Sequence, residues 1–216
     1  MSIDDQGGVS LSKVTLTKAS PTVSLTKHGG ASGLLRVNLN WTAQPASTPS
    51  RSFFGRATAQ PDPIDLDLAC LWELTDGRKG VVQALGNSFS VEDGAGKKIA
   101  WLDGDDRSGE SEGGENIFID LSSLALIKRM VIFTFIYEGA TNWTAANAIV
   151  TLFPVSGPQV EVRLDEAHAL ARMCAIALLE NASGELSVRR DVRYVEGHRA
   201  LDQAYGWGLD WKAGRK

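Results

Sequence analysis

The amino-acid sequence predicts an all-β protein, an antiparallel β-sandwich with short peripheral helices. Apolar and polar residues alternate in many short runs, which is the period expected of strands with one buried face. Ten or more such runs follow one another at roughly regular spacing, separated by Gly, Asn and Asp turn signals. The apolar fraction of 43% and the charged fraction of 22% are those of a folded globular chain.

A short repeat opens the chain. Residues 9–13, 14–18 and 23–27 share the pattern V-[ST]-L-[ST]-K, and each copy alternates as a half-buried strand does. Residues 34–41 alternate in the same way, with apolar side chains on one face and Arg and Asn on the other. We therefore expect antiparallel strands along this part of the chain.

Residues 44–63 contain four prolines together with many Ser and Thr residues, and they predict a long irregular loop. The next two runs, 64–74 and 80–85, are strands separated by the turn signal Asp76-Gly77. They predict a β-hairpin.

The remaining elements are mainly strands, predicted at 98–102, 116–121, 129–138, 148–153, 159–164, 169–180 and 187–194. The composition of 169–180 also suits a helix, but the run lies between strands and is bounded by turn signals, so we predict a strand. Short helical segments are expected at 122–127 and 198–205, and the second opens a C-terminal extension, 198–216. Because sandwiches of about 200 residues often fold as one unit, we predict a single domain over 1–216.

Composition and charge exclude several classes of function. Cys70 and Cys174 lie in apolar runs and are expected to be buried thiols, and without a C-x-x-C pair a zinc or iron–sulfur site lacks ligands. Between 62 and 120 there are 14 Asp and Glu residues against 5 Lys and Arg, which disfavours a nucleic-acid partner. No secretory signal and no membrane-spanning run is recognisable, so we expect a cytoplasmic protein.

No catalytic constellation is recognisable either. Residues 109–113 match G-x-S-x-G, but no apolar strand precedes them, and the two glutamates within the motif would repel an oxyanion. We therefore predict that the protein is not an enzyme.

An acidic, glycine-rich loop is the most informative feature. Between Asp103 and Glu115 lie six carboxylates, four glycines and one cation, Arg107. Such crowding is unfavourable unless water screens it or a cation neutralises it, and glycines let a backbone wrap around one point. Oxygen ligands in a flexible loop favour Ca²⁺ over Mg²⁺. The spacing does not match an EF-hand.

A second acidic pair, Asp65 and Asp67, lies on the strand 64–74. Residues two apart on a strand point to the same face, so both carboxylates are expected side by side while the apolar neighbours face the core. Two alternatives stay open, because the pair could be solvent-facing strand positions and the loop could be a soluble tip. Glu138 is a weaker candidate ligand, expected to be a surface residue. The metal ligands we predict are Asp65, Asp67, Asp103, Asp105, Asp106, Glu112, Glu115 and Asn116.

These residues resemble the TerD-like family of tellurium-resistance and stress proteins, and within it the TerA type. The match covers nearly the whole chain, and the Asp-Leu-Asp strand combined with the Gly-Asp-Asp-Arg-Ser-Gly loop is its most specific part. The matching stretches are Val23-Ser-Leu-Thr-Lys27, Val37-Asn-Leu-Asn-Trp41, Asp65-Leu-Asp-Leu68, Lys79-Gly-Val-Val-Gln-Ala-Leu-Gly-Asn87, Leu102-Asp-Gly-Asp-Asp-Arg-Ser-Gly109, Phe135-Ile-Tyr-Glu-Gly139, Val162-Arg-Leu-Asp-Glu166, Cys174-Ala-Ile-Ala-Leu-Leu-Glu180 and Tyr205-Gly-Trp-Gly208.

The resemblance implies a β-sandwich that binds Ca²⁺ through this strand and loop and acts in resistance to tellurite and other stresses. Asp65, Asp67, Asp105 and Asp106 match the metal-binding pattern directly. Residues 112–116 depart from it, because many members read Gly-Asp-Asp-Glu there and two acidic positions are missing here.

The expected role is a calcium-binding scaffold or sensor. The resemblance implies protein partners of the resistance system, and peripheral association with the inner face of the membrane. Two alternatives belong to other classes: a metal-dependent phosphoester hydrolase using Asp65, Asp67 and Asp105, and a calcium-dependent carbohydrate-binding module in which Trp101 or Trp143 stacks on a sugar ring.

Overall fold

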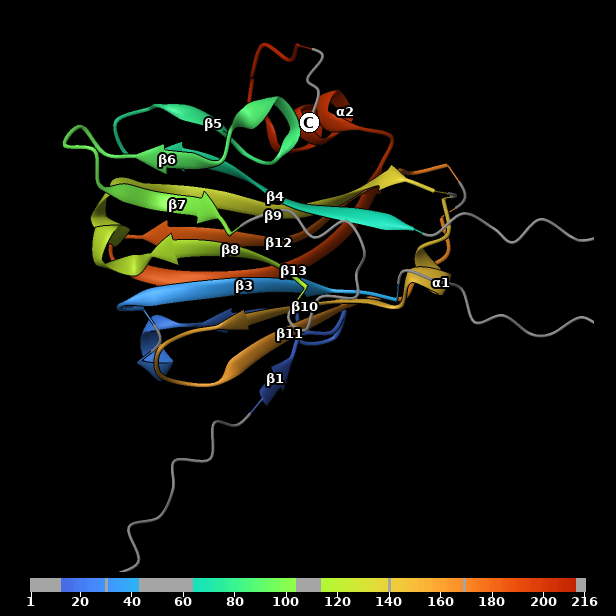
Figure 1. The fold of residues 1–216 in the computed structure, drawn as a ribbon. Helices are drawn as coiled ribbons and strands as arrows, with labels where there is room; N and C mark the ends of the chain where they lie inside the picture. The colour runs from blue at the N-terminus through green and yellow to red at the C-terminus, as the bar shows by residue number, and fades with distance from the viewer. Residues whose placement is uncertain are drawn as a thin grey trace, which may run out of the picture.

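A computed structural model describes residues 13–29, 31–42, 64–103, 114–139, 141–168 and 170–212. Thirteen strands in this part of the chain form two sheets that pack face to face (Figure 1). Every strand pair is antiparallel except β1 with β11, which is parallel. The predicted antiparallel sandwich is therefore confirmed.

The first sheet has seven strands. In spatial order they are β1 (Lys13–Thr15), β11 (Gln159–Leu164), β10 (Ala148–Phe153), β3 (Leu34–Asn40), β8 (Glu115–Asp120), β7 (Lys98–Leu102) and β6 (Ser90–Glu92). The second sheet has six strands. Their order is β2 (Thr22–Ser24), β13 (Glu185–Val195), β12 (Met173–Ala182), β9 (Ile127–Glu138), β4 (Asp65–Leu74) and β5 (Lys79–Val82).

Helical segments are short, as the sequence predicts. They are the 3₁₀ turns η1 (Thr26–His28), η2 (Leu85–Asn87) and η3 (Leu121–Leu126) and the α-helices α1 (Trp143–Ala146) and α2 (His198–Tyr205). The ambiguous run 169–180 is strand β12, and the predicted helix at 198–205 is α2. No local sequence pattern predicted β6 or α1.

The N-terminal repeat is divided between the two sheets. The copy at 14–18 begins in β1, at the edge of the seven-stranded sheet, and the copy at 23–27 contains β2, at the edge of the six-stranded sheet. Each strand is only three residues long, and the apolar Leu16, Val23 and Leu25 are buried. The first copy and the loop 44–63 lie outside the described residues, apart from Lys13.

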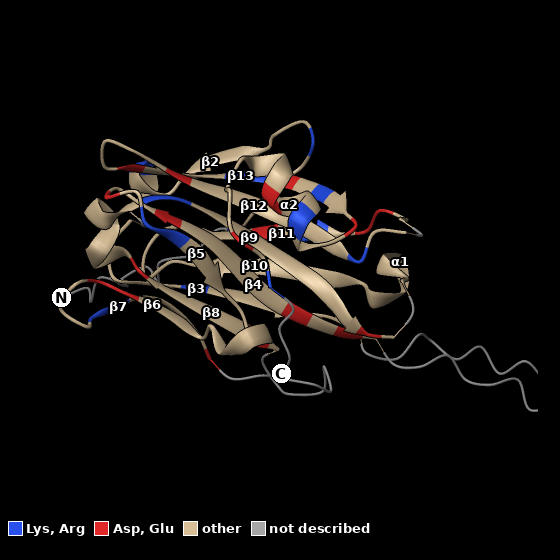
Figure 2. Ribbon diagram, turned by 90° about the horizontal axis from the view of Figure 1, so that it is seen from above, with Lys and Arg blue, Asp and Glu red and all other residues tan. Residues whose placement is uncertain are grey.

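Two apolar clusters stabilise the sandwich. The larger one fills the space between the sheets with the inward-facing residues of both. The smaller one lies on the outer face of the six-stranded sheet, where Ala69, Phe133 and Ala175 are covered by Leu201 of α2 and by Trp207. Figure 2 shows α2 lying over this sheet. Because both faces of β4, β9 and β12 are covered, these strands are apolar nearly throughout.

A buried carboxylate attaches the C-terminal segment to the sheet. Glu73 is 4% exposed and accepts hydrogen bonds from Lys128 (2.8 Å) and Arg129 (2.5 Å). Burial acts to raise the pKa of Glu73, but these hydrogen bonds outweigh it and hold the pKa below its ordinary value. The Arg129 guanidinium also lies 4.1 Å from the centre of the Trp207 ring, and so links the ion-pair group to the segment after α2.

Candidate functional site

Two carboxylates are buried at the start of β4. Asp65 is 8% exposed and Asp67 only 1%, so neither is a solvent-facing strand position. Ile64, Leu66 and Leu68 belong to the core between the sheets, and strand alternation therefore turns both aspartates to the opposite face, as predicted. Acidic residues are marked in red along this end of β4 in Figure 2. Burying carboxylates is unfavourable without compensating partners.

The edge of β4 beside these carboxylates is not covered by its neighbouring strand. β5 pairs with β4 only between Cys70 and Glu73. Just beyond that stretch, the backbone N–H of Leu68 donates a hydrogen bond of 2.5 Å to Oε2 of Glu115. Beyond the last β4–β5 backbone hydrogen bonds, the side chain of Glu115 therefore binds the β4 backbone. The N–H that it binds belongs to Leu68, the residue directly after Asp67.

Glu115 reaches this edge from the other sheet. It is the first residue of β8, shares the inward face of that strand with Ile117 and Ile119, and is 2% exposed. Its carboxylate therefore crosses the interior of the sandwich to contact β4. The fold thus places the buried Glu115 beside the β4 segment that carries the buried Asp65 and Asp67, about 50 residues away in sequence, but on the face of β4 opposite to theirs.

The backbone beneath Glu115 is held from several sides. Asn38 on β3 donates from Nδ2 to the Glu115 carbonyl (3.4 Å) and to Oδ1 of Asn116 (3.1 Å), and Arg36 donates to the same Oδ1 (3.3 Å). Gly114 has φ +59°, and a Cβ at this position would lie 2.1 Å from the carbonyl oxygen of Leu39. The close approach of the loop end to β3 thus requires glycine.

The other predicted ligands fall into three groups. Asn116 points to the outer face of the seven-stranded sheet, where Arg36 and Asn38 bind its side chain, because neighbouring strand residues face opposite ways. Asp103 is exposed at the end of β7, with its N–H bonded to the carbonyl of Asn116 (2.9 Å). Asp105, Asp106 and Glu112 lie outside the described residues.

The described residues alone do not form a complete metal centre. Within those ranges, no three acidic, histidine or cysteine side chains are grouped closely enough to hold a metal ion. Glu138 lies opposite Asp65 in the β4–β9 register and is exposed, as expected for a surface residue.

Cysteine and tryptophan positions bear on the alternative functions. Cys70 and Cys174 are free and buried, as predicted, and burial raises the pKa of Cys70 to about 12 and that of Cys174 well above its ordinary value.

Trp143 is 1% exposed and donates from Nε1 to the carbonyl of Ala171 (2.7 Å), so its ring has no free face for a sugar. Trp101 is half-buried and stacks on Phe118 with ring centres 5.6 Å apart.

Sequence reasoning missed the residues that position Glu115. Asn38 and Arg36 are 77 or more residues away from their partners, and no local pattern marks them. The contact of Glu115 with β4 also depends on the packing of the two sheets.

Comparison with known proteins gives relatives in sequence and in structure. Tellurium resistance protein TerA from Alcaligenes sp is 39% identical over 208 residues, which cover 96% of this chain and 60% of TerA. The chain therefore spans about 60% of the length of that relative. No family model matches the chain.

Two solved structures share the fold. A protein of unknown function aligns with a TM-score of 0.54 and 15% identity, covering 80% of this chain and 95% of the other. A homologue of the telluride resistance protein TerD from Streptomyces coelicolor A3(2) aligns with a TM-score of 0.53 and 22% identity, covering 79% and 94%.

In the described part of the chain, no helix has the length and apolar character needed to cross a membrane. The sequence match extends over 96% of this chain. The chain is therefore a relative of the tellurium-resistance proteins of the TerD-like family, of the TerA type.

Proposed function

We propose that this chain is a calcium-binding, non-catalytic module of a tellurite- and stress-resistance system. The observation that carries the proposal is the pair of buried carboxylates Asp65 and Asp67, on the strand whose next backbone N–H, that of Leu68, is bound by the buried Glu115. Carboxylate oxygens are the hard ligands that Ca²⁺ prefers, and a divalent cation would offset the unfavourable burial of like charges.

In this proposal the acidic loop completes the ligand set. The loop joins β7 to β8 and so runs from Asp103 to Glu115. Asp105, Asp106 and Glu112 would supply further oxygens, as Asp103 would from its exposed position. Asn116 would act indirectly, by fixing the backbone of Glu115 through Arg36 and Asn38.

Calorimetric titration with calcium tests the proposal. The wild-type chain should bind calcium below the millimolar range and melt at a higher temperature when calcium is present, because a ligand specific for the folded state raises stability. Asp67→Asn should lose both effects. The matched control is Glu180→Gln, which removes an exposed carboxylate from the same sheet and should behave as wild type. A wild-type chain that neither binds calcium nor gains stability from it would contradict the proposal.

We further propose that the module works in the cytoplasm, within a multi-protein assembly near the inner face of the membrane. The support is the relationship to tellurium-resistance proteins. Fractionation of cells that express a tagged chain, with and without a calcium chelator, tests this role. A tag found only in the soluble fraction under both conditions would contradict membrane association.

A carbohydrate-binding role is the second candidate, because the Trp101–Phe118 stack lies on a sheet face and Lys98 approaches the Trp101 ring to 5.9 Å. A glycan array with and without chelator distinguishes it from the calcium module: sugar binding that Trp101→Ala abolishes would favour the second candidate.

A further inference from the structure

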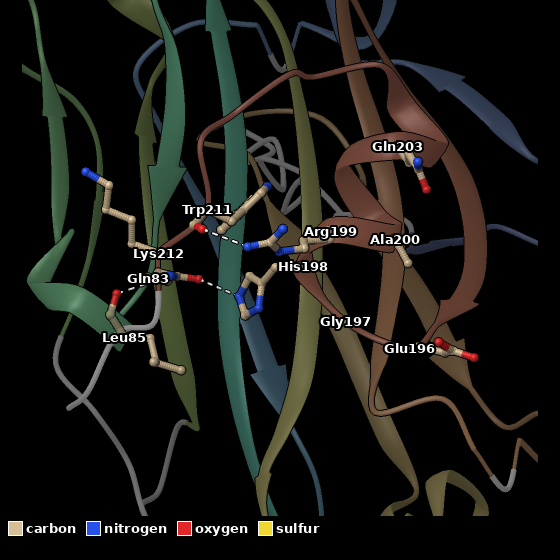
Figure 3. Close-up of a pocket in the computed structure, with 10 residues that line it drawn as sticks. All are labelled: Gln83, Leu85, Glu196, Gly197, His198, Arg199, Ala200, Gln203, Trp211 and Lys212. Carbon is tan, nitrogen blue, oxygen red and sulfur yellow. Dashed lines mark hydrogen bonds between the residues drawn. The ribbon is translucent and has the colours of Figure 1, made fainter.

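A cavity of about 730 Å³ opens at the edge of the six-stranded sheet, and Asp65, Asp67 and Glu115 do not line it. Figure 3 shows its walls, which come from three segments: the end of β5 and η2, the first turns of α2, and the C-terminal residues Trp211 and Lys212. Its size falls in the range of about 300–1,000 Å³ found for small-molecule sites.

The buried side chain of Gln83 determines which nitrogen of the His198 ring carries the proton. Gln83 donates from Nε2 to the carbonyl of Leu85 (3.1 Å), which leaves its Oε1 facing His198 Nε2 at 2.9 Å. An amide oxygen only accepts, so the proton of the neutral imidazole lies on Nε2 and Nδ1 is an acceptor. In the part of the chain that the structure describes, no group donates to Nδ1.

The imidazole is kept uncharged by its surroundings. Phe133, Phe135 and Trp211 lie around the ring, with centre-to-centre distances of 5.9, 5.3 and 4.8 Å. Burial lowers the pKa of His198 to about 4. At neutral pH the ring therefore accepts a hydrogen bond and offers no positive charge to an anion.

Two cationic residues, Arg199 and Lys212, line the cavity. Arg199 uses one N–H to bind the carbonyl of Trp211 (3.2 Å), which leaves other donors of its guanidinium available. Neither cation forms an ion pair with another described residue, but Lys212 is exposed and Figure 3 shows its ammonium turned away from Arg199 and His198. Glu196 also lines the cavity, but Figure 3 shows its carboxylate turned away from His198 and Arg199. The rim thus favours a single negative charge.

We infer that this cavity binds a small planar aromatic acid whose ring carries an O–H or N–H group. The ring lies against the apolar Leu85 and Ala200, its donor bonds Nδ1 of His198, and its carboxylate reaches Arg199. A planar ring suits the aromatic wall formed by His198 and Trp211. This site needs no calcium and stands apart from the function proposed above.

Three probe compounds test the inference by calorimetry or ligand-observed NMR with a chelator present. 4-Hydroxybenzoate has both groups, benzoate lacks the donor, and phenol lacks the carboxylate. Wild-type protein should bind 4-hydroxybenzoate about tenfold more tightly than either partial probe, the change expected for one hydrogen bond or one charge contact to a partly exposed group.

Variants assign the contacts. His198→Phe should abolish the preference for 4-hydroxybenzoate over benzoate, and Arg199→Gln should weaken both acids about tenfold without affecting phenol. Arg163→Gln, at an exposed arginine on β11, is the matched control and should change nothing. If His198→Phe fails to fold, Ala200→Phe fills the cavity instead and should abolish binding. Absence of millimolar binding, equal affinity for all three probes, or a preference that survives His198→Phe would overturn the inference.

Discussion

Glu115 accepts the backbone N–H of Leu68 at 2.5 Å, and this contact joins the two sheets beside Asp67. Glu115 belongs to the seven-stranded sheet and Leu68 to the six-stranded sheet, so the carboxylate has both a structural and a ligand role in our proposal. The two roles respond differently to loss of charge, and substitution can therefore separate them.

Glu115→Gln should retain the fold and lose most of the calcium response. The amide oxygen can still accept from Leu68, but the negative charge that a divalent ion requires is gone. We expect the calcium-dependent rise in melting temperature to fall by more than half, measured by differential scanning calorimetry. Glu92→Gln, at an exposed position on β6, is the control and should keep the full rise. An unchanged response in Glu115→Gln would remove this residue from the site.

Gly114→Ala should be strongly destabilising. An added Cβ would lie 2.1 Å from the carbonyl oxygen of Leu39, and the residue would also hold a left-handed φ of +59°. Together these effects should lower the free energy of unfolding by about 2–4 kcal/mol, as measured by urea denaturation. Gly184→Ala is the matched control, since φ there is +90° but nothing lies within 4 Å, and it should lose only about 1 kcal/mol. Equal losses in the two variants would show that the close approach to β3 does not matter.

Acidification below pH 6.5 should destabilise the protein through His198. The folded-state pKa of about 4 lies below the ordinary value of 6.5, so between these limits the unfolded chain binds a proton that the folded chain does not. Stability should therefore fall as the pH decreases from 6.5 to 4, by about 1–3 kcal/mol because the ring is partly exposed.

Urea denaturation at several pH values measures this effect. His198→Phe removes the titrating group, and its stability should be nearly constant between pH 6.5 and 5. A slope as steep as that of wild type would assign the pH dependence to other groups.

Asp202→Asn should detach the C-terminal segment from α2. The carboxylate accepts from the N–H groups of Gly208 and Leu209 (both 2.8 Å) and from Nε1 of Trp211 (2.9 Å). Burial acts to raise the pKa of Asp202, but the bonds from Leu209 and Gly208 outweigh it and lower the pKa. An amide has only one accepting oxygen, so we expect a loss of about 2–3 kcal/mol and stronger quenching of Trp211 fluorescence by iodide.

The matched control for this substitution is Gln203→Ala, which changes an exposed neighbour on the same helix. It should leave both the unfolding free energy and the quenching unchanged. If Asp202→Asn leaves them unchanged too, the segment is held mainly by Trp207 and the apolar cluster beneath it.

Local sequence patterns determined the fold class and most of the strands. Alternation along β3 depends only on which side chains the strand must bury, and that information is present in consecutive residues. The shared face of Asp65 and Asp67 follows from the same period, and so it was predictable. The short helix α2 was also recognisable from its own residues.

Position within the sheets was decided only by the tertiary structure. The repeat copies at 14–18 and 23–27 look alike in sequence, yet β1 and β2 are edge strands of different sheets, because pairing partners far along the chain select their places. Whether Asp67 is exposed or buried likewise depended on the packing around β4 rather than on its neighbours in sequence.

Glu115 and Asn116 show most clearly what the local sequence predicts and what only the tertiary structure decides. As loop residues they could both face one ion, but β8 begins at Glu115, and a strand turns adjacent side chains to opposite faces. Glu115 therefore enters the interior and Asn116 binds Arg36 and Asn38 outside. The sequence by itself determined which acidic groups are present, and the packing of two sheets, through contacts between residues tens of positions apart, determined where each of the described ones lies.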